Sequence, residues 1–279
     1  KVTKGKKKSA ASSDESEPED SDDDDDDISK AKTFTKLKSI LCKNIQSNKF
    51  VPKDCKNPKV TEKKIASTVK GKYKDYFDRA IDDDDDECLY YVANSILKGI
   101  NTFPRDKGMS FKYMKKAASL GNPNAIYGLT YLMVPDFTKE DEEEELIQNY
   151  INILKTAVVF QNPIASYVIG NLYALGLQLD KNYIMSLVYI KYAADLKFPP
   201  AMMMYADQLR KVVIGKIKRK EMNELKEKSI NILNDTSDSS TRSNELRKVA
   251  KTLFTTIEDT KLADKMSRIY YQKIINLKD

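Results

Sequence analysis

Histidine and tryptophan are absent from this chain of 279 residues, and cysteine occurs only at Cys42, Cys55 and Cys88. Without histidine there is no Ser-His-Asp or Cys-His nucleophile pair, and no imidazole to bind a metal or carry a proton. Because the three cysteines form no CxxC pair, structural zinc and a disulfide framework are not expected, and a reducing compartment fits best. We therefore expect no enzymatic activity, no cofactor and no metal site, in a protein of the cytoplasm or nucleus.

Long apolar segments and glycine-rich loops are also missing. No apolar run approaches the 18 residues of a membrane-spanning helix, and no glycine-rich loop leads to the GK[ST] of a nucleotide cradle. Two acidic runs, 82–87 and 140–145, lack the alternating spacing of a calcium loop. Both precede a predicted helix, whose dipole favours negative charge at its start, so we interpret them as helix-entry charge.

Charged residues are numerous but unevenly distributed. Residues 9–27 contain eleven acidic residues and no basic one, whereas residues 28–80 contain fifteen Lys and Arg against four acidic residues. The first 32 residues have almost no apolar content, so they cannot offset the conformational entropy lost on ordering. We predict a disordered basic and acidic tail over 1–32, a partly helical basic linker over 33–64 and a folded domain over 65–278.

The two charged segments each allow two interpretations. The acidic tract suits binding to basic proteins such as histone tails, and Ser12, Ser16 and Ser21 each have an acidic residue three positions on, which makes them candidate phosphorylation sites. Alternatively, it is a solvating tail that shields the basic segment beside it. The lysines of that basic segment could contact phosphate backbones or an anionic surface. Alternatively, the basic segment docks on the first helix of the folded domain.

A repeated pattern dominates the rest of the chain. From about residue 65 onward, apolar residues recur at the three- and four-residue spacing of an α-helix. Two stretches, beginning at Cys88 and Ala165, each contain a helix of about twelve residues, a loop that starts at a glycine, and a second helix that ends near two alanines. Weaker copies begin at Ala125, Ala201 and Glu245, which gives spacings of 37, 40, 36 and 44 residues.

This pattern resembles the Sel1-like repeat, a relative of the tetratricopeptide repeat. The copy that begins at residue 165 fits the repeat best, through Ala165, Ile169, Gly170, Tyr173, Gly176 and Asp180. The longer and more variable spacing favours the Sel1-like form, since a tetratricopeptide array would hold near 34 residues. The resemblance implies an all-α fold: a right-handed α-solenoid of about five helix-turn-helix repeats behind a disordered N-terminal arm.

The spacing of small and large residues has a physical reason. Small residues at the first and sixth positions of the first helix let neighbouring helices approach closely, and larger ones at the fifth and ninth positions fill the space between them. No single helix pair can bury its apolar stripe alone, so the stack of repeats is the predicted folding unit.

The first helix of each repeat, helix A, presents a candidate binding face. Its seventh position lies off the packed stripe and is occupied in turn by Asn94, Tyr131, Asn171 and Asp207. Its third position is occupied in turn by Tyr90, Tyr127, Tyr167 and Met203. Rows of Tyr and Asn combine rigid aromatic area with adaptable hydrogen bonding, which suits an extended peptide. Alternatively, the third-position tyrosines pack against the next helix.

Members of the Sel1-like family act as adaptors, and the resemblance therefore implies a similar role here. We predict a non-enzymatic scaffold that binds a partner protein or peptide in the concave groove lined by the A helices. Two alternatives stay open. One is a nuclear protein that associates with nucleic acid or histones through its charged N-terminal arm. The other is a regulatory part of a larger multidomain protein, such as one with a kinase domain.

Overall fold

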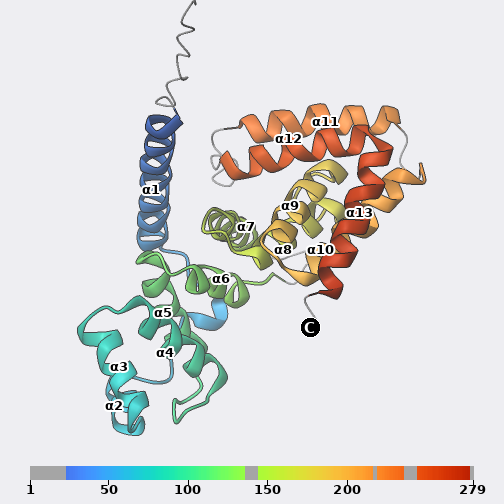
Figure 1. Cartoon of the computed structure of the whole chain (residues 1–279). Helices are drawn as coiled ribbons and strands as arrows, with labels where there is room; N and C mark the ends of the chain where they lie inside the picture. Colours follow the sequence, from blue (N-terminus) through green and yellow to red (C-terminus); the bar gives the residue numbers. More distant parts are fainter. Residues whose placement is uncertain (1–22, 136–143, 216–218, 236–243, 277–279) are drawn as a thin grey trace, which may run out of the picture. The chain divides into compact units, whose positions relative to one another are not determined.

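The computed structural model describes residues 23–135, 144–215, 219–235 and 244–276, and over these residues the chain forms helices and no strand (Figure 1). The prediction of an all-α fold is confirmed. The helices, in chain order, are α1 (Asp23–Ser47), the short 3-10 helix η1 (Lys53–Cys55), α2 (Glu62–Thr68), α3 (Lys72–Asp82), α4 (Asp86–Lys98), α5 (Lys107–Ser119), α6 (Pro123–Leu132), α7 (Glu144–Val159), α8 (Pro163–Leu175), α9 (Tyr183–Asp195), α10 (Pro199–Val213), α11 (Arg219–Asn234), α12 (Asn244–Glu258) and α13 (Thr260–Ile275).

The chain divides into two units, Lys1–Lys36 and Leu37–Asp279, and the repeats lie in the second. Helix α1 begins at Asp23, so helix extends into residues 23–32, which the composition assigned to a disordered tail. Its first residues are aspartates, and negative charge at a helix start is favoured by the macrodipole. The rest of that tail, including the phosphorylation candidates Ser12, Ser16 and Ser21, lies outside the described residues.

Three helix pairs follow the predicted repeat pattern: α4–α5, α6–α7 and α8–α9. In each pair the first helix is helix A and the second is helix B, and the two pack along their length. Glycines in the left-handed conformation end two of the A helices, Gly99 at φ 67° and Gly176 at φ 73°. Glycine has no Cβ, so its backbone adopts this conformation at little cost, which explains why glycine occupies both positions.

Asparagine and aspartate side chains start the helices of the repeats. Asn122 and Asn162 each accept a hydrogen bond from the backbone N–H three residues on, at 2.9 Å, and a proline follows each of them. Asp106 and Asn182 cap the B helices α5 and α9 in the same way. The Sel1-like pattern placed the loop aspartate of the third repeat at Asp180, but Asp180 is exposed and Asn182 makes the cap. An amide oxygen accepts the same hydrogen bond as a carboxylate.

The core of each repeat lies between its A and B helices, at the expected register. On α8, Ala165 and Ile169 are fully buried and Tyr173 is nearly so. The Tyr173 ring stacks on Tyr189 of α9 with the centroids 5.7 Å apart. Gly170 occupies the closest point of approach, since a Cβ built there would lie 2.7 Å from Ile190 Cγ1 and 3.2 Å from the carbonyl oxygen of Ser186.

Replacing Gly170 with alanine is therefore expected to lower the free energy of unfolding by about 1–3 kcal/mol, although alanine has the higher helix propensity. The added methyl group meets the backbone of α9, which cannot move without shifting the helix pair. Gly128→Ala is the matched control, because its Cβ would meet the flexible end of Met114. Chemical denaturation of both variants tests this. Equal stability of Gly170→Ala and the parent would contradict the described packing of α8 on α9.

The C-terminal repeats differ from the prediction. The sequence suggested that α12 and α13 form a fifth helix pair starting at Glu245, after a fourth pair starting at Ala201. In the structure α13 packs along α10, and α11 does not take the position of helix B beside it. The Ser267 hydroxyl of α13 donates to the Ala206 carbonyl of α10 at 3.0 Å, as Ser110 of α5 donates to the Ala93 carbonyl of α4 at 2.8 Å. Helix α13 is therefore helix B of the fourth repeat.

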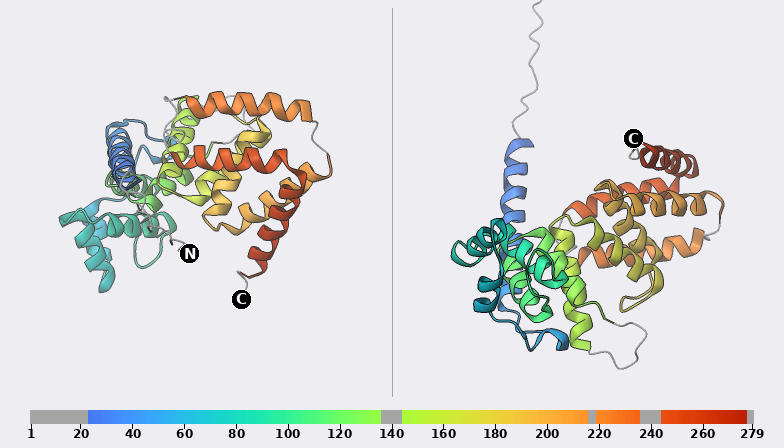
Figure 2. Two further views of the ribbon diagram at one scale, coloured as in Figure 1. Left: turned by 45° about the horizontal axis from the view of Figure 1, so that its top comes forward. Right: turned by 90° about the horizontal axis from the view of Figure 1, so that it is seen from below.

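Helices α11 and α12 are an insertion between the two helices of the fourth repeat. They lie side by side (Figures 1 and 2), and both contact α9. As a result every residue of α9 from 184 to 194 is buried. A helix buried on all sides belongs to the interior of a fold rather than to the surface of a solenoid. The sequence signal for this arrangement is the scarcity of polar residues in α9: between 184 and 194 only Ser186 and Lys191 interrupt the apolar residues, so the helix has no polar face.

The segment predicted as a basic linker packs against the first two repeats. The buried residues Leu37, Leu41 and Ile45 lie on one side of α1. The Asn48 side chain donates to that of Asn149 on α7 at 2.6 Å. Buried Asp106 accepts hydrogen bonds from the backbone N–H groups of Lys59 at 2.6 Å and Val60 at 2.9 Å. The carboxylate that caps α5 thus also fixes the preceding segment on it.

Candidate protein-binding face

The A helices bury one face and leave the opposite face accessible. On α4, α6, α8 and α10 the buried positions are those of the repeat core, and the third and seventh positions are partly or largely exposed. We call these positions the A-helix face; it comprises Tyr90, Asn94, Tyr127, Tyr131, Tyr167, Asn171, Met203 and Asp207. Tyr131 is exposed over 68% of its surface and Met203 over 51%.

The third-position tyrosines take part in packing as well as facing outward. Tyr167 meets Phe198 edge-on, with the ring centroids 5.5 Å apart. Burial raises the pKa of Tyr127, so its hydroxyl stays protonated. Tyr90 is half-buried on α4. Each of these side chains therefore presents one edge of a ring held by its neighbours, which limits the entropy lost when a partner binds.

The seventh-position residues differ in whether another helix binds their side chains. The Asn171 side chain donates to the Tyr167 carbonyl of its own helix at 3.0 Å, a bond that constrains no other helix. Asn94 is half-exposed on α4. Asp207, in contrast, accepts a hydrogen bond from the Tyr271 hydroxyl of α13. The sequence could not reveal this contact, because it arises from the packing of α13 on α10.

The B helices, unlike the A helices, are covered by other parts of the same chain. The C-terminal half of α1 lies against the first two repeats, where the Lys38 ammonium group stands over the Phe160 ring at 5.1 Å from its centroid. The residues after η1 approach α5 so closely that a Cβ on Gly108 would lie 2.8 Å from the Cys55 carbonyl oxygen. Helices α11 and α12 cover α9. The added helices thus occupy the B side of the repeats, and the A-helix face stays accessible within the described part of the chain.

Chemical groups that could support catalysis do not gather in the described part of the chain. No three His, Cys, Asp or Glu side chains there come close enough to hold a metal ion. Burial raises the pKa of the Cys55 thiol to about 11 and also raises those of Cys42 and Cys88. Their thiols are therefore protonated near neutral pH and react poorly as nucleophiles.

One residue of the first acidic run, 82–87, caps the start of α4. Asp85 accepts a hydrogen bond from the Cys88 backbone N–H at 2.9 Å and caps α4. That bond is the main reason why the pKa of Asp85 is lowered, and the ion pair with Arg79 adds to it. Most of the second run, 140–143, lies outside the described residues. No helix in the described part of the chain is both long enough and apolar enough to cross a membrane.

The chain is similar to solved Sel1-repeat structures at low sequence identity. No protein-family model matches the sequence, and no curated protein matches it. A Sel1 repeat protein from Oxalobacter formigenes has a TM-score of 0.40 at 21% identity, and the match covers 48% of this chain and 96% of that one. The protective antigen c5321 of uropathogenic Escherichia coli, which displays an SLR fold, has a TM-score of 0.45 at 16% identity, over 72% of this chain and 41% of that one. Both are Sel1-repeat proteins.

We use the name Sel1-like repeat for the helix pairs α4–α5, α6–α7, α8–α9 and α10–α13. The likeness to the solved proteins concerns the fold. Besides these pairs, the chain contains the segment before α3 and the α11–α12 insertion. Both lie against B helices of the Sel1-like repeats.

Sequence analysis missed two cavities that these additions create. One, of about 400 Å³, lies between α1 and α7 and includes four asparagines in its lining, Asn44, Asn48, Asn149 and Asn152. The other, of about 390 Å³, includes three lysines of α5 in its lining, Lys112, Lys115 and Lys116. The lysines are visible in the sequence as a cluster, but only the fold shows that residues of α1 and α2 close a cavity over them.

Proposed function

We propose that this helical repeat protein is a non-enzymatic scaffold that binds an extended segment of a partner protein along the A-helix face. The observation that carries the proposal is the contrast between the two sides of the repeats. The chain covers the B helices α5, α7 and α9 with α1, η1, α11 and α12, whereas the third and seventh positions of the A helices keep accessible Tyr, Asn and Met side chains.

The chemistry of the A-helix face suits a peptide better than a small molecule. Tyrosine and methionine are enriched in the buried centres of protein interfaces, where they supply contact area. Asparagine amides donate and accept at once, as peptide groups do, so they can pair with the backbone of an extended segment. Asp207 is the exception, since its carboxylate is already engaged by Tyr271. We therefore place the centre of binding on α4, α6 and α8.

The double variant Asn94→Ala with Asn171→Ala tests the proposal. We expect it to weaken binding of the main partner, identified by capture with the full chain, by about tenfold or more. Its melting temperature should equal that of the parent, because Asn171 bonds only within its own helix. Calorimetric titration of the purified partner against both proteins gives the two affinities.

A matched control is Lys228→Ala, a single truncation at an exposed position of α11, away from the A helices. It should leave the affinity unchanged. If the double variant binds as tightly as the parent, the A-helix face is not the site. If a chain that lacks the charged N-terminal arm then fails to bind, the alternative function through that arm replaces the present proposal.

A further inference from the structure

The lysine cavity lies apart from the A-helix face, among α1, α2, α3 and α5. Its volume of about 390 Å³ falls within the range of small-ligand sites. The cavity is lined by Gln46, Glu62, Ile81, Lys112, Tyr113, Lys115, Lys116 and Ser119. Three ammonium groups and one carboxylate therefore face the same space, which gives the lining a net positive charge.

Tyr113 contributes a buried hydroxyl group that has no well-formed hydrogen bond. Only 1% of the residue is exposed, and among the described residues no hydrogen bond of normal length and geometry reaches its hydroxyl oxygen, although the Glu62 carboxylate lies near it. The ring is held edge-on against Phe77, with the centroids 6.4 Å apart, which fixes its position on the cavity wall. Burial, the charge of Glu62 and a weak hydrogen-bonding interaction with the Glu62 side chain raise the pKa of Tyr113, so the hydroxyl carries its proton. Buried polar groups are nearly always satisfied, and an unsatisfied one calls for an explanation such as a missing ligand.

The three lysines have partners that leave donors available. Lys112 pairs with Glu62 at 2.8 Å, and Lys116 pairs with Asp84. Lys115 donates to the backbone carbonyl of Asn48, and burial lowers its pKa. A carbonyl oxygen does not neutralise an ammonium group, so this hydrogen bond leaves the charge of the partly buried Lys115 uncompensated. Each ammonium group has three donors, and these contacts use one of them.

We propose that this cavity binds a phosphate monoester group, with the Lys115 ammonium group and the Tyr113 hydroxyl as its principal donors. A phosphate ester offers three acceptor oxygens and a charge near −2, which would match the several donors and the net positive charge of this lining. The lining contains lysines and no arginine. Lysine binds phosphate as a point charge through its ammonium donors. The site is independent of the A-helix face, so the two proposals can fail separately.

The group could belong to a small phosphorylated molecule or to a phosphorylated side chain, and the experiment separates these sources. The full chain is titrated calorimetrically with O-phospho-L-serine, with a phosphoserine peptide and with the same peptide unphosphorylated. Binding of both phosphorylated probes with similar affinity indicates that the phosphate group itself is recognised. Much tighter binding of the phosphopeptide indicates a protein segment as the source. If none of the phosphorylated probes binds more tightly than the unphosphorylated peptide, the proposal is overturned.

Four variants test the residues. Lys115→Ala should weaken binding of the phosphorylated probe about tenfold, while Lys63→Ala, which removes an exposed lysine of α2 outside the lining, should not change it. Glu62→Gln should tighten binding severalfold, because it removes the one negative charge of the lining. Tyr113→Phe should weaken binding but raise the melting temperature of the free protein, since it removes an unsatisfied buried hydroxyl. A merely structural Tyr113 predicts a lower melting temperature instead. Equal losses in Lys115→Ala and Lys63→Ala would show diffuse surface attraction and overturn the site.

Discussion

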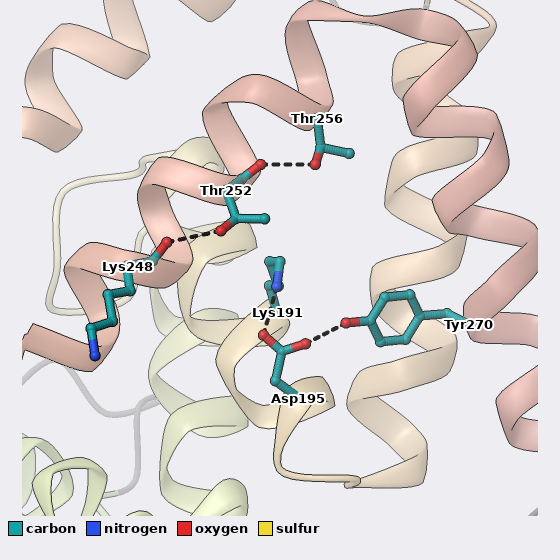
Figure 3. Close-up of polar contacts among 6 residues, drawn as sticks. All are labelled: Lys191, Asp195, Lys248, Thr252, Thr256 and Tyr270. Atoms are coloured by element: carbon teal, nitrogen blue, oxygen red, sulfur yellow. Dashed lines mark hydrogen bonds and ion pairs between the residues drawn. The ribbon is translucent and has the colours of Figure 1, made fainter. Parts of the chain in front are cut away.

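Replacing Asp195 with alanine is expected to cost about 3–5 kcal/mol of the free energy of unfolding, with the lower end favoured because the Asp195 side chain is 35% exposed. Asp195 stands between two partners from different helices (Figure 3). Its carboxylate pairs with Lys191 of the same helix at 2.6 Å and accepts a hydrogen bond from the Tyr270 hydroxyl of α13. Lys191 is only 6% exposed, so loss of the carboxylate leaves a buried charge unpaired.

The double variant Lys191→Met with Asp195→Leu is the matched control. It removes both charges at once, and replacing a buried ion pair by apolar residues of similar size is often neutral or stabilising. The ring of Tyr205 lies 6.0 Å from the Lys191 ammonium group and can pack against methionine instead. Chemical denaturation should therefore rank the double variant well above Asp195→Ala. Equal stability of the two variants would mean that Asp195 does not compensate the buried charge of Lys191.

Ending the chain at Glu258, before α13, is expected to unfold α10 as well as to remove the last helix. Helix α13 covers α10 through Tyr270, whose ring meets Tyr205 edge-on at 4.9 Å, and through the bond from Ser267 to the Ala206 carbonyl. Large side chains buried in this contact, such as Leu209 and Ile274, contribute about 1.5–3 kcal/mol each. The loss of several of them exceeds the effect of any single substitution considered above.

Hydrogen exchange measured by mass spectrometry distinguishes this outcome from a sequential array. If α13 is helix B of the fourth repeat, the amides of α10 lose protection in the shortened chain, while those of α4 and α5 keep it. In a sequential array, α13 would pair with α12, and its removal would expose α12 first. Full protection of the α10 amides together with lost protection of the α12 amides would show that α13 is not helix B of the fourth repeat.

Local features of the repeats were predictable because their causes are local. Glycine at 99 and 176 indicates helix ends, since few other residues adopt the left-handed conformation at low cost. The small residues at 165 and 170 indicate close helix contacts, and the structure places both in the interior. Each of these signals lies within one turn or one helix.

The exposure of the A-helix face was only partly predictable, because contacts between distant helices are not local. Helical periodicity shows which positions lie off the packed stripe, and Tyr131 is indeed largely exposed. It does not show which exposed side chains other helices occupy, as Tyr271 does with Asp207. The lysine cavity was beyond reach, because Gln46, Glu62 and Lys115 lie far apart in the chain and meet only after α1 and α2 pack near α5.

By itself, then, the sequence determined the helical class, the helix ends and the side of each A helix that enters the core, because propensity, capping and periodicity act over a few residues. The tertiary structure decided which B helix closes the fourth repeat, which faces the added helices cover and where charges from distant segments meet. Helix B of any repeat carries a similar apolar stripe, so the stripe cannot specify its partner. That choice depends on complementary contacts across the interface, such as Tyr270 with Asp195 and Ser267 with Ala206, which exist only once the chain has folded.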